Sequence, residues 1–424
     1  MPVGKEPPEK ERRPFAVMAK PVGSACNMRC TYCYYLHTEG SNDKGRMSRE
    51  VLERLIRDAI ASSPGPVVSF TWHGGEPTLA GLPFYREAVA LQKKMLPAGW
   101  ECWNNLQTNG LALDEEWCAF LRQEHFDVSL SIDGDRANHD LFRKDTAQRP
   151  TYERIAASIR LLQQHGIEAD LLCTVTAAAS KNGKQIYRAL REFQTGWMQF
   201  IPIVVRKGET SVTEESVLPE EYGTFLKEVF SEWLFHDLDR TEVQLFSEMA
   251  LVLSGTPANL CWMREECGDV PVAEKDGSVY SCDHFVKPQY RIGSLQDTSL
   301  RDLVDSPAQR EFGMQKKTGQ PRACRECEWR MFCHGGCPKD RFLPTEGETE
   351  KQYFLCEGLK DFFAYAVPRL KEAMRLSALG RSRQQIMEEL TLQERARFKG
   401  LSRNDPCPCG SGKKLKKCCL KYCP

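Results

Sequence analysis

Cysteine is the residue that most constrains this chain, because there are 19 in 424 residues and most of them are clustered. Three groups stand out: residues 26–33 contain three cysteines, residues 261–356 contain eight and residues 407–419 contain four. The first 14 residues are charged and proline-rich and lack the apolar stretch of a signal peptide, so we expect a cytoplasmic protein. Disulfides are rare in that reducing compartment. We therefore expect the clustered thiols to bind metal ions or iron–sulfur clusters.

The overall composition argues against several classes of partner. Lys plus Arg and Asp plus Glu both number 58, and this absence of net charge argues against specific binding of nucleic acid. No uninterrupted apolar run approaches the ~18 residues that a membrane helix needs, so we expect no membrane partner. Hydrophobic residues make up 41% of the chain, which is enough to bury ordinary globular cores.

Short β-like runs alternate with amphipathic helical stretches from residue 15 to about residue 235. We expect strands at Phe15–Val22, Val67–Trp72, Trp103–Thr108, Val128–Ile132, Ala169–Val175 and Met198–Val204. Helical periodicity follows these runs at Ser48–Ser62, Pro83–Met95, Asp114–Gln123, Tyr152–His165, Lys181–Phe193 and Pro219–Phe235. Six such units predict an α/β fold of parallel strands joined by right-handed crossovers. An open doubly wound sheet and a barrel two units short of eight both fit this pattern.

The first cysteine group has the spacing C-x3-C-x2-C, formed by Cys26, Cys30 and Cys33 directly after the first expected strand. Three thiolates can hold three irons of a [4Fe–4S] cluster and leave the fourth iron without a protein ligand. An open metal position is typical of a reactive site rather than a purely structural one. A zinc loop is the alternative, although it normally has a fourth Cys or His nearby.

The segment CNMRCTYCYY, which includes Tyr32, resembles the cysteine loop of the radical S-adenosylmethionine (SAM) enzymes. This resemblance implies a SAM-binding [4Fe–4S] cluster in a partial (β/α)6 barrel, whose active site lies at the C-terminal ends of the strands. It implies SAM-binding roles for Gly74, Gly75, Glu76 and Pro77 at the amino group, Ser131 and Asp133 at the ribose, and Arg143 at the carboxylate. Without the resemblance, these residues would be turn caps or surface ion pairs.

Eight cysteines between residues 261 and 356 can make two complete four-cysteine sites, and their spacing alone does not distinguish zinc from iron–sulfur binding. Their order resembles the SPASM extension of radical SAM enzymes, particularly the anaerobic sulfatase-maturating enzymes, where two auxiliary [4Fe–4S] clusters are held in crossed order. The resemblance assigns one cluster to Cys261, Cys267, Cys282 and Cys337, and the other to Cys324, Cys327, Cys333 and Cys356. Neither site can then close until both ends of the segment have folded.

Asp283 directly follows the expected cluster ligand Cys282. It matches the residue proposed as the general base in the sulfatase-maturating enzymes, and the resemblance implies the same catalytic role here. We expect a carboxylate beside a substrate and a low-dielectric cluster wall to have a raised pKa.

The third group resembles the zinc motif at the C-terminus of the SecA translocation ATPase and contains Cys407, Cys409, Cys418 and Cys419. Four soft ligands predict a structural Zn²⁺, because a segment this short cannot form its own apolar core. Five lysines make the segment basic: Lys413, Lys414, Lys416, Lys417 and Lys421. The lysine-rich pattern predicts that this tail docks to an acidic protein or a ribosomal surface. The alternative is that the tail is solvated and only stabilises the chain.

Together these patterns divide the chain into five parts. We expect a flexible tail (residues 1–14), a radical SAM partial barrel (15–240), a SPASM auxiliary-cluster domain (241–370), a helical linker (371–401) and a SecA-like zinc motif (402–424).

The resemblance implies oxygen-independent oxidation of a Cys or Ser, in the C/S-x-P-x-R motif of an unfolded sulfatase, to Cα-formylglycine. An electron donor such as flavodoxin or ferredoxin would allow cleavage of SAM to methionine and a 5′-deoxyadenosyl radical, which takes a hydrogen atom from the β-carbon of the target. The auxiliary clusters would accept the second electron. Two rivals remain: another SPASM peptide maturase, which makes a thioether, cross-link or epimer, and a non-catalytic metal-bound adaptor.

Overall fold

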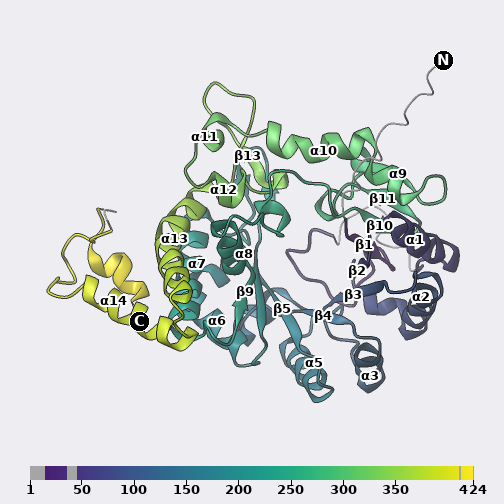
Figure 1. The fold of residues 1–424 in the computed structure, drawn as a ribbon, viewed down its shortest axis with the longest axis horizontal. Helices are drawn as coiled ribbons and strands as arrows, with labels where there is room; N and C mark the ends of the chain where they lie inside the picture. The colour runs from purple at the N-terminus through teal and green to yellow at the C-terminus, as the bar shows by residue number, and fades with distance from the viewer. Residues whose placement is uncertain (1–14, 36–44, 410–411, 424) are drawn as a thin grey trace.

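A curved sheet with helices on its outer side forms the main body of the molecule (Figure 1). The computed structural model describes residues 15–35, 45–409 and 412–423. The expected flexible tail, residues 1–14, lies outside these ranges. None of the described helices combines the length and the apolar character needed to cross a membrane.

Ten strands form the main sheet, in the order β12-β11-β10-β1-β2-β3-β4-β5-β6-β9. The strands are β1 (Val17–Lys20), β2 (Val67–Trp72), β3 (Glu101–Thr108), β4 (Asp127–Ser131), β5 (Ala169–Val175), β6 (Trp197–Pro202), β9 (Glu242–Val243), β10 (Val272–Glu274), β11 (Ser278–Tyr280) and β12 (Arg291–Ser294). Strands β1 to β6 pair in parallel with their neighbours in sequence order, which confirms the expected six parallel strands. Two small antiparallel sheets pair β7 (Arg206–Lys207) with β8 (Ser211–Val212), and β13 (Arg341–Leu343) with β14 (Gln352–Tyr353).

Helices follow the barrel strands at the expected places, since each has an apolar face to bury. They are α1 (Arg49–Ser62), α2 (Leu82–Met95), α3 (Glu115–Gln123), α4 (Arg136–Phe142), α5 (Tyr152–Gln164), α6 (Gly183–Arg191) and α7 (Pro219–His236). The side chain of Ser48 caps α1 by accepting a hydrogen bond from the Val51 N–H at 3.3 Å. Helix α4 is an addition that the periodicity did not predict.

The cysteine-rich segment is built onto the barrel rather than beside it. Strand β10 pairs in parallel with β1, with Lys20 opposite Glu274, so the main sheet continues into the segment. The remaining helices are α8 (Gln244–Leu253), α9 (Leu300–Val304), α10 (Pro307–Thr318), α11 (Arg322–Arg325), α12 (Arg330–Cys333), α13 (Cys356–Ala378) and α14 (Arg383–Arg397). Helices α10, α11 and α12 lie together at the top of Figure 1. The sequence pattern missed β10 because a three-residue strand carries too little periodicity.

Helix α13 packs along α7, the last helix of the barrel (Figure 1). The two backbones touch at two glycines, Gly223 on α7 and Gly358 on α13. A Cβ atom on Gly358 would lie 1.8 Å from the carbonyl oxygen of Pro219, and a Cβ atom on Gly223 would lie 2.5 Å from the carbonyl oxygen of Gly358. Since Gly358 is two residues from Cys356, this contact fixes one expected cluster ligand against the barrel. The helix runs without interruption through residue 370, where the expected SPASM domain ends.

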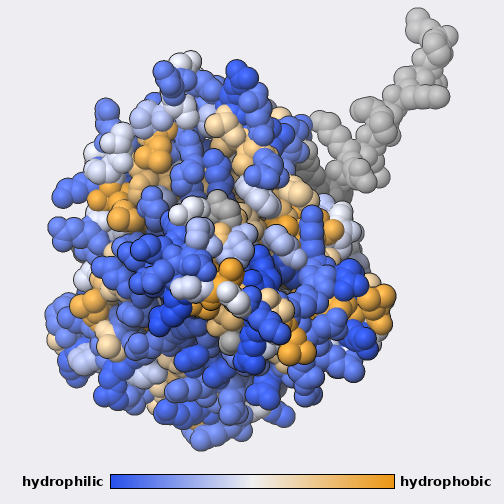
Figure 2. Space-filling view, turned by 90° about the vertical axis from the view of Figure 1, so that its left-hand side faces the viewer, coloured by the Kyte–Doolittle hydropathy of each residue, from blue (hydrophilic) through white to orange (hydrophobic). Residues whose placement is uncertain are grey.

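The C-terminal tail docks on the same pair of helices. Tyr422 is buried, with its ring centroid 5.2 Å from that of Tyr365 on α13, and Lys227 on α7 lies over both rings. The side of the molecule that carries α14 is mostly hydrophilic, with small separate apolar areas (Figure 2). The tail is therefore joined to the body by this aromatic contact and by Phe398, which packs with the tail residues Cys407, Leu415 and Cys419.

Candidate active site and metal centres

The loop with Cys26, Cys30 and Cys33 begins at the C-terminal end of β1, and the Gly74–Pro77 turn after β2 packs directly against it. The N–H of Gly75 donates to the carbonyl oxygen of Gly23 at 2.8 Å, and the N–H of Glu76 donates to that of Ala25, also at 2.8 Å. A Cβ on Gly75 would lie 2.2 Å from the Ala25 oxygen, so only glycine fits here. This glycine is thus required by the approach of the two backbones.

Glu76 is buried and ties the ends of β2 and β3 together. One carboxylate oxygen accepts hydrogen bonds from the hydroxyls of Thr78 at 2.5 Å and Thr108 at 2.6 Å, and the other accepts from the N–H of Asn109 at 2.8 Å. Asn109 also contacts the sulfur of Cys26, with its Nδ2 3.7 Å away. The expected SAM ligand Glu76 therefore lies next to the cysteine loop, already held by protein donors.

Asp133, Arg143 and Tyr32 form one buried cluster on the other side of the loop. Arg143 Nε donates to one carboxylate oxygen of Asp133 at 3.0 Å, and the Tyr32 hydroxyl donates to the same oxygen. The other oxygen accepts from the Thr174 N–H at 2.9 Å. Although burial lowers the pKa of Arg143, the charge of Asp133 raises it well above its ordinary value. The guanidinium therefore stays charged, and its terminal nitrogens make no hydrogen bond to the residues described.

Ser131 lies at the end of β4, two residues before Asp133. Its side chain is partly exposed and makes no hydrogen bond to a described residue. It therefore remains available for the expected contact with the ribose.

Asp283 lies where the cysteine-rich segment meets the first cysteine loop. Its carboxylate accepts a hydrogen bond from the hydroxyl of Tyr34, the residue after Cys33, and lies 2.5 Å from the Nζ of the fully buried Lys20. Burial raises the pKa of Asp283, but the positive charges of Lys20, His73 and His284 together outweigh burial and hold that pKa well below its ordinary value. The expected raised pKa is therefore wrong, because the sequence analysis did not foresee a buried lysine beside this carboxylate.

The eight cysteines of residues 261–356 fall into two spatial groups. In the first group, burial raises the pKa of Cys282, and the negative charges of Cys337 and Cys261 raise it further. The negative charge of Cys261 also raises the pKa of Cys267. The second group lines a single cavity and consists of Cys324, Cys327, Cys333 and Cys356. The structure thus brings together the two crossed sets that the resemblance assigned.

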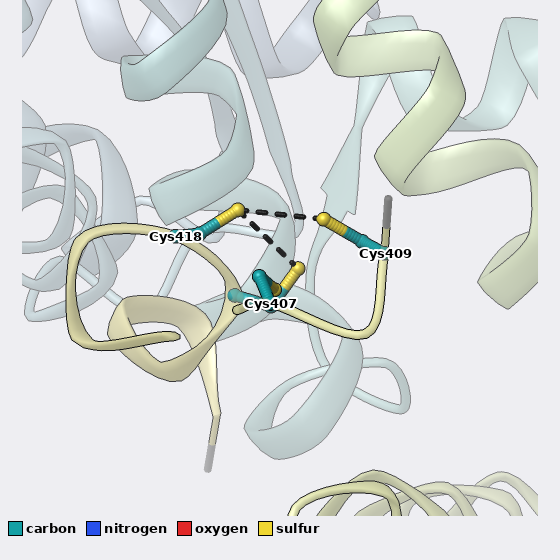
Figure 3. Close-up of side chains that lie close together, drawn as sticks. Cys407, Cys409 and Cys418 are labelled. Atoms are coloured by element: carbon teal, nitrogen blue, oxygen red, sulfur yellow. Dashed lines mark hydrogen bonds between the residues drawn. The ribbon is translucent and has the colours of Figure 1, made fainter. Parts of the chain in front are cut away.

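The last four cysteines converge at the C-terminus. The sulfur atoms of Cys407, Cys409, Cys418 and Cys419 all lie within 4.8 Å of one another. Those of Cys409 and Cys418 are 3.5 Å apart, and Cys407 lies close to both (Figure 3). Tetrahedral zinc with Zn–S bonds of ~2.3 Å places its sulfurs about 3.8 Å apart, so these residues fit the expected ion.

The open site and the second auxiliary set also fit their expected groups. Burial and the nearby charge of Glu76 raise the pKa of Cys26 to about 12, and a bound metal ion favours the thiolate form of such a buried thiol. The cavity between the second set of cysteines offers four thiols around one space, as a cubane cluster requires.

Two residues of this site were missed by sequence reasoning. Lys20 interrupts an apolar strand yet is fully buried, and a charged residue in such a run was the available signal. Tyr34 lies within the quoted cysteine motif, but nothing in the sequence shows that its hydroxyl reaches Asp283, 249 residues further on.

Models of known protein families match three stretches of the chain. Residues 21–179 match the radical SAM superfamily, residues 272–328 match the iron–sulfur cluster-binding domain SPASM, and residues 403–421 match the SEC-C motif.

Similar proteins cover most of the chain. A serine-type anaerobic sulfatase-maturating enzyme of Bacteroides thetaiotaomicron is 37% identical, over 84% of this chain and 90% of that protein. A cysteine-type enzyme of Clostridium perfringens is 34% identical, over 84% and 97%. The solved structure of native anSMEcpe with bound AdoMet and Cp18Cys peptide matches with a TM-score of 0.78 and 32% identity, over 85% of this chain and 98% of that one. The chain therefore belongs to the anaerobic sulfatase-maturating enzymes of the radical SAM superfamily.

Proposed function

We propose that this protein oxidises a Cys or Ser in the C/S-x-P-x-R motif of an unfolded sulfatase to Cα-formylglycine, without oxygen. The observation that carries this proposal is the contact of Asp283 with Tyr34 and Lys20. It joins the segment of the first auxiliary set to the open cysteine loop at one site. Both serine-type and cysteine-type relatives support the reaction, and a related structure contains a bound peptide.

When bound, SAM and its [4Fe–4S] cluster would supply the radical, and the two auxiliary [4Fe–4S] clusters would take up the second electron of the oxidation. The chain's own residues position the reactants around them. Arg143, held by Asp133 through one nitrogen, offers its remaining donors to the SAM carboxylate. Ser131 and Asp133 would contact the ribose, and the turn containing Gly74, Gly75, Glu76 and Pro77 would hold the amino group. Tyr32, bonded to Asp133, fixes the loop that carries the first cluster.

Asp283 acts as the general base in this proposal. Lys20 keeps the carboxylate ionised, which is the state that can accept a proton as the substrate radical loses its electron. The Tyr34 hydroxyl holds the second oxygen and so fixes the direction in which the carboxylate points.

Two kinds of protein partner complete the proposal. A flavodoxin or ferredoxin supplies the electron for SAM cleavage. The basic tail, folded around Zn²⁺ by Cys407, Cys409, Cys418 and Cys419, docks to an acidic protein or a ribosomal surface. The closeness of the four sulfur atoms supports zinc binding. The lysines of the tail support docking to a negatively charged surface.

Anaerobic reconstitution with synthetic peptides tests the proposed reaction. One peptide carries C-x-P-x-R, a second carries S-x-P-x-R, and a third with Ala at the target position is the control. We expect mass spectrometry to show loss of hydrogen sulfide with gain of one oxygen from Cys, or loss of two hydrogens from Ser. A thioether, a cross-link or an epimer would contradict the proposal in favour of another peptide maturase, and SAM left uncleaved with every peptide would favour an adaptor.

A further inference from the structure

Two cations, the buried Lys316 and the half-buried Arg341, lie between the auxiliary cysteine sets, and the proposed reaction gives neither a role. Lys316 on α10 is fully buried. Its Nζ donates to the carbonyl oxygens of Cys261 at 3.2 Å and Trp262 at 3.0 Å, and also to that of Arg264. The ammonium therefore holds the loop that carries Cys261, a ligand of the first set.

Arg341 on β13 holds the stretch between the two sets. Its Nε donates to the carbonyl oxygen of Gly335 at 2.8 Å, and its Nη2 donates to that of His334 at 2.9 Å. These residues lie between Cys333 of the second set and Cys337 of the first. Its Nη1 donates to the carbonyl oxygen of Lys316 itself at 2.7 Å, so the two cations belong to one hydrogen-bonded unit.

No carboxylate of the described residues lies within ion-pair distance of either cation. Burial lowers the pKa of Lys316 to about 8, and the nearby thiolates of Cys267 and Cys261 oppose that effect. Burial also lowers the pKa of Arg341, and the negative charges of Cys324 and Cys267, one from each set, raise it. Because an unpaired buried charge is costly, the negative charge that balances these cations is expected in the cysteine sites themselves.

We propose that Lys316 and Arg341 are positioning residues that raise the reduction potentials of both auxiliary clusters and hold the ligand loops of the two sites together. A cluster with four thiolates is already negative, and an added electron makes it more so. A fixed positive charge nearby stabilises the reduced form, and low solvent exposure limits screening of that charge. The inference rests on the cluster-binding part of the proposed function and deepens it: the same clusters must accept the electron that leaves the substrate.

A redox titration followed by electron paramagnetic resonance tests this role without substrate. The full chain carries Ala at Cys26, Cys30 and Cys33, so that only the auxiliary signals remain. We expect Lys316→Gln to shift the potential of the first cluster to more negative values, with a smaller shift of the second, and Arg341→Gln to lower both. Lys317→Gln is the matched control, because Lys317 is next in sequence but its side chain is 41% exposed and pairs with Glu265.

Iron content decides how each outcome is interpreted. A neutral variant that retains all its iron, about eight atoms per chain, and has the same potentials as the Lys317→Gln control would overturn the inference alone. A parent protein without iron in these sites would overturn the proposed function, and this inference with it.

Charge-conserving variants decide the case in which both neutral variants lose iron. Iron retained in Lys316→Arg and Arg341→Lys would show that the sites require the positive charge, as proposed. Iron lost from these variants as well would mean that the exact hydrogen-bond geometry matters and not the charge, and would overturn the inference.

Discussion

The open cysteine loop and the auxiliary sites gather their ligands over very different lengths of chain. Cys26, Cys30 and Cys33 lie on one loop, whereas the auxiliary ligands extend from residue 261 to residue 356. The loop is held by a neighbouring turn, and the auxiliary sites are held by β10 in the barrel sheet and by α13 against α7. Local spacing therefore suffices for the reactive site, while the auxiliary sites depend on the whole fold.

The largest effect is expected from removing the open site. Changing Cys26, Cys30 and Cys33 together to Ala abolishes SAM cleavage and leaves the auxiliary sites loaded, because their ligands are held by other elements. Metal analysis should give about eight irons per chain, against about twelve in the wild type. If the triple variant still produces 5′-deoxyadenosine, the assignment of the reactive cluster is wrong.

Asp283→Asn probes the junction between the two regions. The substitution keeps the shape of the side chain but removes the proton acceptor, so formylglycine formation is expected to fall ~10²–10⁴-fold. SAM cleavage in the presence of peptide continues, since hydrogen abstraction precedes proton loss. Both products are quantified in one reaction mixture. Peptide oxidation at nearly the wild-type rate would remove Asp283 from the mechanism.

Gly75→Ala tests whether the turn positions the cysteine loop. A Cβ 2.2 Å from the Ala25 oxygen forces the loop to move, and a misplacement of ~1 Å costs about 10²-fold in rate. The readout is SAM cleavage, with the two auxiliary clusters expected at full occupancy. Gly196→Ala is the control, because the nearest obstacle there is the end of the Glu168 side chain. Equal rates in the two variants would show that the close contact has no functional role.

The smallest effect is expected at the C-terminal tail. Deleting residues 402–424 removes the zinc but leaves iron content and peptide oxidation unchanged, because none of the expected iron ligands lies in the tail, which contacts α7, α13 and Phe398. Tyr422→Ala, which keeps the zinc ligands, is expected to free the tail to limited proteolysis and to cost the body the ~0.5–1.5 kcal/mol of an aromatic pair. Loss of SAM cleavage in the deletion variant would instead make the tail part of the catalytic fold.

The sequence predicted what depends on local pattern. The six parallel strands and the helices between them were predictable, since apolar periodicity determines both. The three-cysteine loop was also predictable, because its three cysteines are close in sequence.

The sequence did not reveal contacts between distant segments. Lys316 is buried and Arg341 is half-buried, and lysine and arginine are normally surface residues, so nothing local marks these two as interior. The pKa of Asp283 was predicted in the wrong direction because Lys20 lies 263 positions before it in the chain. The pairing of β10 with β1 was missed for a related reason: the partner that stabilises this short strand is far away in sequence.

The most direct test of the account follows one hydrogen atom. A peptide deuterated at the β-carbon of the target Cys or Ser is incubated anaerobically with the reconstituted enzyme and SAM. We expect 5′-deoxyadenosine to gain one deuterium as formylglycine forms, because the radical made at the open cysteine loop acts on that carbon. Formylglycine produced together with unlabelled 5′-deoxyadenosine would contradict it.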